Sequence, residues 1–166
     1  MSNIIERDIK PEWIDSAEFR ALEMGAINNS FMQGKGNKIG FIGEYVVMDY
    51  LQERNEDASI KLVDTFDYDI AFNDMKIDVK SKGIKVKPKA CYEASIASTS
   101  KHQKCDAYIF VAVHSSLDTA YVYGWEYKED YFKKAKHMKK GDVDTSNNYV
   151  CRSDCYNLRY GDLRQF

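Results

Sequence analysis

Hydrophobic and polar positions alternate most regularly between residues 65 and 82. The alternation is interrupted at Asn73-Asp74, two residue types that tolerate the positive φ of a tight hairpin turn. Because successive side chains on a strand point to opposite faces, this stretch predicts a β-hairpin with one apolar and one charged face. The apolar face carries Tyr68, Ile70, Phe72, Met75, Ile77 and Val79, and the charged face carries Asp67, Asp69, Lys76, Asp78 and Lys80.

The turn sets the register of the predicted hairpin. With a two-residue loop, Asp69 lies opposite Asp78, and Asp67 lies opposite Lys80. Like charges in direct opposition weaken a sheet by roughly 0.2 to 1 kcal/mol, so we expect a cation between Asp69 and Asp78. Two carboxylates followed by a nearby lysine are typical of Mg²⁺-dependent hydrolysis of phosphodiesters. The alternative interpretation is an ordinary solvated hairpin face.

Apolar spacing before the hairpin predicts two helices. After a loosely held arm of residues 1–11, the first helix is expected from Asp15 or Ser16 to about Ser30. The second, from about residue 38 to residue 54, is apolar on nearly all sides, which indicates a helix packed inside the fold.

The second predicted helix contains one acidic residue within its apolar stretch, Glu44, next to Gly43. Gly40, Gly43, Glu44 and Val47 share a helix face. Glycines let such a face approach a sheet closely, and a carboxylate carried inward is costly unless it meets a charged or hydrogen-bonding partner. We therefore expect Glu44 to point toward the hairpin carboxylates; the alternative is a solvated Glu44.

The rest of the chain predicts further strands and one more helix. Residues 107–113 form a nearly continuous β-prone run, which is typical of a buried central strand. The other expected elements are strands at 59–63, 91–97 and 119–125, a helical turn at 98–104, a helix at 126–138, and an edge strand within 149–166. The interpretation is a single α/β (α+β) domain spanning residues 1–166, with a core at about 38–125 and a C-terminal segment, 126–166, made of a helix and an edge strand.

Composition fits an ordinary globular protein. The chain has 166 residues, 44% hydrophobic and 30% charged. No apolar run approaches the roughly 18 residues of a membrane span, and the N-terminus lacks a signal-peptide pattern, so a cytoplasmic protein with no membrane partner is expected. Its four cysteines, at 91, 105, 151 and 155, should then be reduced thiols. A zinc site using Cys151 and Cys155 is the alternative.

Charge gives only a local indication of a nucleic-acid partner. The net charge is −2, so the whole molecule is not strongly attractive to nucleic acid. Lysines are nevertheless concentrated just after the hairpin, where they could contact phosphates. These candidates are Lys82, Lys85, Lys87 and Lys89. A second basic cluster, at residues 133–140, is interpreted as a solvated edge.

The order of a helix with Gly43-Glu44, a strand reaching Asp69, and a strand with Asp78-Val79-Lys80 resembles the PD-(D/E)xK nuclease superfamily. The stretch from Asn37 to Tyr50 also looks like the opening of small phage and bacterial members. The resemblance covers roughly residues 38 to 125, and Tyr68-Asp69 stands where the family usually has Pro-Asp.

This resemblance implies a restriction-endonuclease-like core, a central mixed β-sheet flanked by helices. It implies Mg²⁺ or Mn²⁺ held by Asp69, Asp78 and Glu44, with the backbone of Val79, and Lys80 positioning or activating water. Asp67, Lys82 and Gln103 are possible accessory residues.

The function expected from the sequence is a metal-dependent DNA nuclease, endo rather than exo, which could act as a homodimer to cut both strands. One alternative is a catalytically silent nuclease-like module that binds nucleic acid or a protein. A fold outside this superfamily, with a solvated hairpin, is another.

Overall fold

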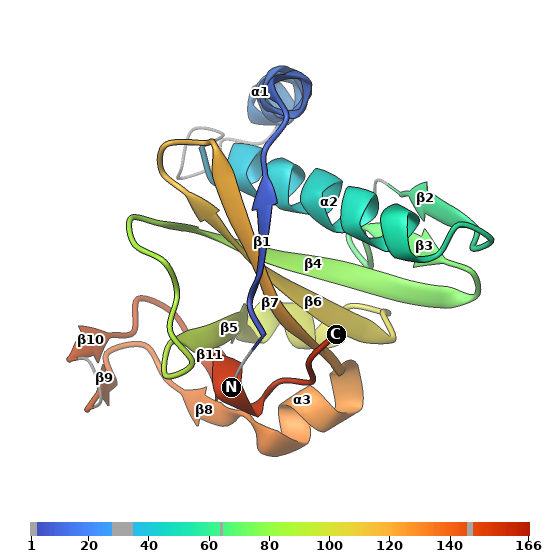
Figure 1. Cartoon of the computed structure of the whole chain (residues 1–166). Coiled ribbons are helices and arrows are strands. Elements are labelled where there is room, and N and C mark those ends of the chain that lie inside the picture. Colours follow the sequence, from blue (N-terminus) through green and yellow to red (C-terminus); the bar gives the residue numbers. More distant parts are fainter. Residues whose placement is uncertain (1–2, 28–34, 64, 146–147) are drawn as a thin grey trace.

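The computed structural model describes residues 3–27, 35–63, 65–145 and 148–166. They form a mixed α+β structure built on a curled six-stranded sheet with the strand order β1-β7-β6-β4-β3-β2. Two helices, α1 and α2, cover one side of this sheet; α3 and a small second sheet lie on the other (Figure 1). The predicted α/β class with a mixed sheet and flanking helices is confirmed at this level.

The main sheet is antiparallel except at its centre, where β4 and β6 are parallel. β6 is buried along almost its whole length, as its continuous apolar run predicts. The six strands are β1 (Ile5–Asp8), β2 (Ile60–Leu62), β3 (Ile70–Phe72), β4 (Met75–Ile84), β6 (Ala107–His114) and β7 (Thr119–Tyr127).

Helices α1 (Pro11–Ile27) and α2 (Lys35–Arg54) enclose the first hydrophobic core with one face of the sheet. α2 contributes Ile42, Val46 and Val47, none of which is exposed to solvent, so the prediction of an internal second helix is confirmed. α1 starts at Pro11, earlier than predicted, because proline is well suited to the first helical position. Among the described residues, no helix is both long and apolar enough to cross a membrane.

The prediction of a loose N-terminal arm at residues 1–11 is wrong for the strand at 5–8, and residues 1–2 lie outside the described residues. Residues 5–8 form β1, which pairs antiparallel with β7. The alternation over four residues is too short to predict a strand from the sequence. The strand forms because these residues pair with the edge of β7.

The second core lies on the opposite face of the sheet and is rich in aromatic rings. Tyr108, Phe110 and Tyr123 project from β6 and β7 onto Tyr131 and Tyr160. It is closed by α3 (Lys128–Lys134) and by a three-stranded sheet in which β11 (Cys155–Arg159) lies between β5 (Glu93–Ala97) and β8 (Lys136–Met138). Short elements complete the chain: the 3-10 helices η1 (Ser98–His102) and η2 (Tyr160–Asp162), and the strands β9 (Val143–Asp144) and β10 (Tyr149–Val150).

Two predictions for the C-terminal segment need correction. The helix expected at 126–138 is limited to α3, because Glu126 still belongs to β7 and residues 136–138 pair with β11. The expected edge strand is in fact the middle strand of the second sheet. Strand pairing with distant segments overrides the local helical pattern in both cases.

The central hairpin has the predicted register over its inner part. Phe72 pairs with Met75 and Ile70 with Ile77, and Asn73 takes a φ of 50° in the turn. The outer part differs, because β3 begins only at Ile70. The predicted position of Asp67 opposite Lys80 is therefore wrong; the Asp67 carboxylate instead accepts a hydrogen bond from the Lys104 backbone N–H at 3.0 Å.

Close packing of α2 on β4 depends on Gly43. A Cβ built on Gly43 would lie 1.9 Å from Oγ and 3.0 Å from Cβ of Ser81, whereas one on Gly40 would have nothing within 4 Å. Of the two glycines on this face, only Gly43 therefore serves the predicted close approach, and it brings the next residue, Glu44, against the sheet.

We expect Gly43→Ala to destabilise the protein by about 1 to 3 kcal/mol, the usual cost of overpacking. Gly40→Ala is the matched control and should be neutral or stabilising by up to about 1 kcal/mol, because alanine is the better helix former. Urea unfolding measures both. Ser81→Ala should recover part of the Gly43→Ala loss, since it removes the hydroxyl nearest the new methyl group. Equal stability of the two alanine variants would contradict close packing at Gly43.

Candidate active site

Asp69 and Asp78 lie close together near the start of β3, at the end of the hairpin away from its turn. Asp69 immediately precedes β3, and its Oδ2 accepts a hydrogen bond from the Val79 N–H at 2.7 Å. Asp78 lies on β4 with only 3% of its surface exposed. Asp69 thus lies against the strand that carries Asp78, close enough for the charge of Asp78 to act on its pKa.

The pKa values of this pair reflect burial and the charged groups around each carboxyl group. Burial, followed by the negative charges of Asp78 and Glu44, raises the pKa of Asp69 to about 8, against the opposing effects of the Val79 N–H and the Lys80 ammonium. Burial also raises the pKa of Asp78, although Lys80 and Gln103 favour its charged form. Without metal, Asp69 therefore keeps its proton at neutral pH.

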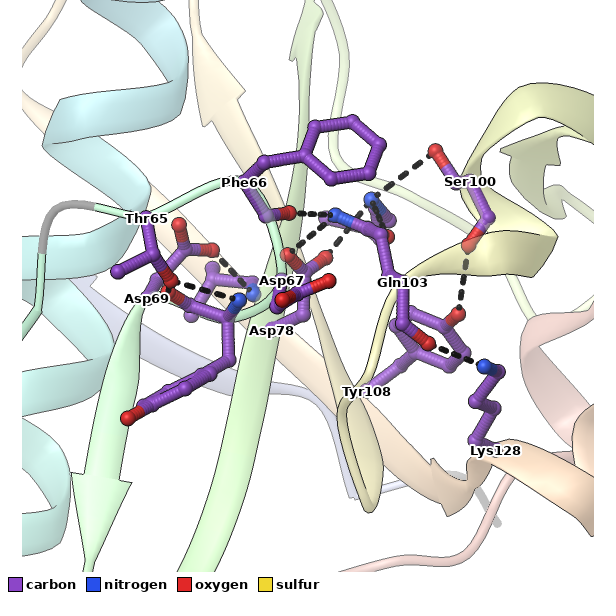
Figure 2. Close-up of polar contacts among 12 residues, drawn as sticks. Thr65, Phe66, Asp67, Asp69, Asp78, Ser100, Gln103, Tyr108 and Lys128 are labelled. Carbon is purple, nitrogen blue, oxygen red and sulfur yellow. Dashed lines mark hydrogen bonds and ion pairs between the residues drawn. The ribbon is translucent and has the colours of Figure 1, made fainter.

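Lys80 and Gln103 hold Asp78 in place. The Lys80 Nζ lies 2.7 Å from Asp78 Oδ2 and donates a hydrogen bond to Gln103 Oε1 at 3.0 Å. The Gln103 Nε2 donates to Asp78 Oδ1 at 2.9 Å and to the Phe66 carbonyl at 2.7 Å, as Figure 2 shows. Since the amide oxygen accepts from the ammonium and the amide nitrogen donates to two oxygens, the orientation of Gln103 is fixed. This matches the expectation that Gln103 lies at the site.

The connection between β4 and β6 places Gln103 at the site. Parallel neighbours need a long connection, and this one runs through β5 and η1 before reaching Gln103. The connection ends at Asp106, whose backbone N–H donates to the Lys76 carbonyl at 2.8 Å and whose Oδ2 accepts from the Lys76 N–H at 2.8 Å. These contacts fix the start of β6 beside the start of β4, two residues before Asp78.

Glu44 points inward from α2, as predicted, and is 7% exposed. Its charge contributes to the raised pKa of Asp69, which places it on the same side of the molecule. Its Oε2 lies 3.1 Å from Nη1 of Arg20 on α1, and the Arg20 guanidinium stacks 3.8 Å from the centroid of the Phe41 ring. Arg20 thus provides the cationic partner that a buried Glu44 requires.

Sequence reasoning missed Arg20, Ser100 and the Phe66 carbonyl. Ser100 Oγ lies 3.5 Å from the Lys80 Nζ. No pattern in the sequence relates these residues to the acids, because each is brought to the site by tertiary packing. Only the inward Glu44, which needs a cation, indicated that a residue such as Arg20 must exist.

The remaining predicted residues lie away from this cluster or make other contacts. The Asp67 carboxylate caps the Lys104 N–H, as described above. The Lys82 Nζ donates to the Glu93 carbonyl at 2.8 Å, and Lys87 pairs with Glu6 at 3.2 Å. Lys85 and Lys89 are exposed. Contact of these lysines with nucleic acid stays a prediction.

The donor set suits a hard cation held by few protein ligands. Asp78 Oδ2 is buried, and no group among the described residues makes a hydrogen bond of good geometry to it; its contact with Lys80 is ionic. Within the same residues, no three His, Cys, Asp or Glu side chains are already arranged to hold a metal. Mg²⁺ commonly binds through one or two carboxylates, with waters and substrate phosphate completing its shell, so Asp69 and Asp78 fit this mode.

No family model matches the chain, and no curated protein matches it in sequence. The interpretation of the site therefore rests on its own residues and their geometry.

The cysteines lie outside the acidic cluster as free thiols: Cys91 is exposed, Cys155 half-buried, and Cys105 and Cys151 buried. Cys151 and Cys155 are neighbours, and burial together with Cys151 raises the pKa of Cys155 to about 11. No third His, Cys, Asp or Glu of the described chain joins them in a metal-binding group, so a zinc site is not supported.

We expect Asp69→Asn to remove a pH dependence of stability. The folded-state pKa of Asp69 is raised from 3.8 to about 8. Between these values the native protein keeps a proton that the unfolded chain releases, so stability falls as pH rises, by at most about 1.4 kcal/mol per pH unit. Without metal, urea unfolding from pH 5 to pH 8 should show this fall in the wild type and a flatter profile in Asp69→Asn. Asp106→Asn is the control, because Asp106 is an exposed carboxylate that also accepts a hydrogen bond from a backbone N–H. Parallel profiles for the wild type and Asp69→Asn would contradict the raised pKa.

Proposed function

We propose that the protein is a metal-dependent DNA nuclease that hydrolyses phosphodiester bonds at Asp69, Asp78 and Lys80, with Glu44 beside them. One observation carries this proposal: the half-buried Asp69, just before β3, and the buried Asp78, on the neighbouring strand β4, lie next to an ammonium group that is 2.7 Å from Asp78 Oδ2 and whose position is fixed by the buried Gln103. The same observation supports the restriction-endonuclease-like core that the sequence resemblance implies.

The cost of this arrangement favours a functional role. Burying two like-charged groups side by side raises the free energy of the folded protein, and packing alone gives no reason to keep both. Strongly shifted pKa values with specific charged partners are typical of functional sites. A divalent cation would remove the repulsion and let both carboxylates ionise.

In this proposal Asp69 and Asp78, with the backbone of Val79, hold Mg²⁺ or Mn²⁺. The bound ion supplies positive charge to the scissile phosphate and lowers the pKa of the attacking water. Lys80, restrained by Gln103 and Ser100, directs its ammonium group at the phosphate or the water. The ion pair with Arg20 restrains Glu44, whose negative charge acts on Asp69.

A second candidate is a nuclease-like module that binds nucleic acid or a protein without cutting. The ion pairs of Asp78 with Lys80 and of Glu44 with Arg20 favour it, because they neutralise acidic groups within the chain itself. Such internal pairing is what a site that had lost its metal would need. Metal binding and cleavage separate the two candidates.

We expect Mg²⁺ or Mn²⁺ to raise the melting temperature of the wild type. At a hundred times its dissociation constant a ligand stabilises by about 2.7 kcal/mol, which is roughly 5 to 10 °C for a chain of this size. Asp78→Asn should lose most of the rise, and Asp106→Asn should keep it. NaCl of matched ionic strength controls for screening. Identical shifts in the wild type and Asp78→Asn would exclude a metal at this pair.

We expect the wild type to cut DNA with Mn²⁺ and not with EDTA. Closed circular plasmid and single-stranded DNA should both be tested, because nicking of the circle identifies an endonuclease. Lys80→Ala should lower the rate by about a hundredfold to ten-thousandfold, the usual effect of removing an acid–base or charge-stabilising group. Lys61→Ala, at an exposed lysine on β2, should cut normally. Equal cutting by the wild type and Lys80→Ala would indicate a contaminant, and no cutting by the wild type would favour the silent module.

A further inference from the structure

An exposed aromatic side chain lies at the rim of the candidate site. Phe66 leaves 69% of its surface open to solvent, while its carbonyl accepts the hydrogen bond from Gln103. Figure 2 shows the Phe66 ring turned away from Asp78, beside the Gln103 amide that holds the acid. Covering such a ring typically gains about 1.5 to 3 kcal/mol, so leaving it exposed forgoes a sizeable stabilisation.

Hydrogen bonds hold the loop that carries Phe66 on both sides of this residue. The Thr65 hydroxyl donates to the Tyr68 carbonyl at 3.0 Å and accepts from the Tyr68 N–H at 3.3 Å. Asp67 accepts from the Lys104 N–H at 3.0 Å. With the Gln103 bond, these contacts fix the backbone of residues 65–68 without covering the ring. A held but uncovered ring is arranged for contact with something outside the chain.

An exposed lysine follows the buried Gln103 on the segment beside this ring. This residue is Lys104, whose backbone N–H binds Asp67, next to Phe66. The other nearby lysine, Lys101, is engaged elsewhere, because its ammonium group donates to the Tyr156 hydroxyl at 3.4 Å. A ring together with a lysine beside the candidate site is a combination by which proteins hold single-stranded nucleic acid: a base stacks on the ring and a phosphate contacts the lysine.

We propose that Phe66 stacks on a base next to the scissile phosphate, with Lys104 contacting a neighbouring phosphate, so that the preferred substrate is single-stranded DNA. This inference deepens the proposed function and rests on it for the cleavage step. A paired base in a duplex has both faces covered by its neighbours, so the ring could stack only on an unpaired base or one freed from its stack. One site suffices to cut a single strand, so a homodimer is not needed for this substrate.

The first experiment measures binding without turnover. A fluorescein-labelled single-stranded oligonucleotide and the matching duplex are titrated with protein in EDTA, with fluorescence anisotropy as the readout. Phe66→Ala should weaken single-strand binding by roughly 5- to 150-fold, the effect of losing one base stack, and leave duplex binding unchanged. Phe66→Trp should keep single-strand affinity. Phe19→Ala is the matched control, because Phe19 is a phenylalanine of α1 that is 64% exposed.

The second experiment measures cleavage of the same oligonucleotides with Mn²⁺. Phe66→Ala should lower the rate on the single strand at subsaturating DNA by a similar factor, while Phe19→Ala should match the wild type. Replacing DNA with RNA of the same sequence tests whether the sugar matters, because stacking alone does not distinguish the two. Since the ring is exposed, the melting temperature of Phe66→Ala should equal that of the wild type.

The outcomes separate this inference from the proposed function. If Phe66→Ala binds a single strand as tightly as the wild type, or loses single-strand and duplex binding equally, the stacking role is overturned even where the wild type cuts DNA. If the wild type cuts nothing yet its single-strand binding depends on Phe66, the nuclease proposal fails and the binding inference stands.

Discussion

The burial of Asp69 beside Asp78 is the constraint on which the arrangement of the site depends. The negative charge of Asp78 disfavours ionisation of Asp69, whereas the Val79 N–H favours it, and Lys80 and Gln103 favour the charged form of Asp78. Four segments of the chain must therefore meet at one place: the start of β3, the middle of β4, the end of η1 and the face of α2. The arrangement of the strands and helices brings these four segments together.

Two features of the backbone bring these segments together. The parallel pairing of β4 with β6 requires a long connection, and that connection delivers Gln103 to the strand that carries Asp78 and Lys80. On the other face, Gly43 lets α2 approach Ser81 so closely that the next residue, Glu44, reaches the vicinity of Asp69. The acids thus come from the helix and hairpin, whereas Gln103, which orients Asp78, comes from the connection.

The two faces of the main sheet carry different side chains. Aliphatic side chains against α1 and α2 form one core, and aromatic side chains against α3 and the second sheet form the other. Asp78 and Lys80 alternate with Val79 along β4, so the charged pair faces the second layer while Val79 packs against the helices. This alternation places the buried Asp78 and the half-buried Lys80 on the same face of the sheet as the aromatic core.

Much of the site could be predicted from the sequence because it is encoded locally. The turn at Asn73-Asp74 and the period-two alternation determine the inner hairpin, and the apolar character of α2 together with Gly43 predicts an inward Glu44. The exact pairing of Asp67 could not be predicted, because the strand ends where Thr65 and Asp67 find other hydrogen-bond partners. The C-terminal strands and β1 likewise exist only because distant strand edges pair with them. Local pattern thus determined which acids face inward. Tertiary structure alone decided that Arg20 meets Glu44, that Ser100 meets Lys80 and that the Phe66 carbonyl meets Gln103, since contacts between residues far apart in the chain leave no periodic signal.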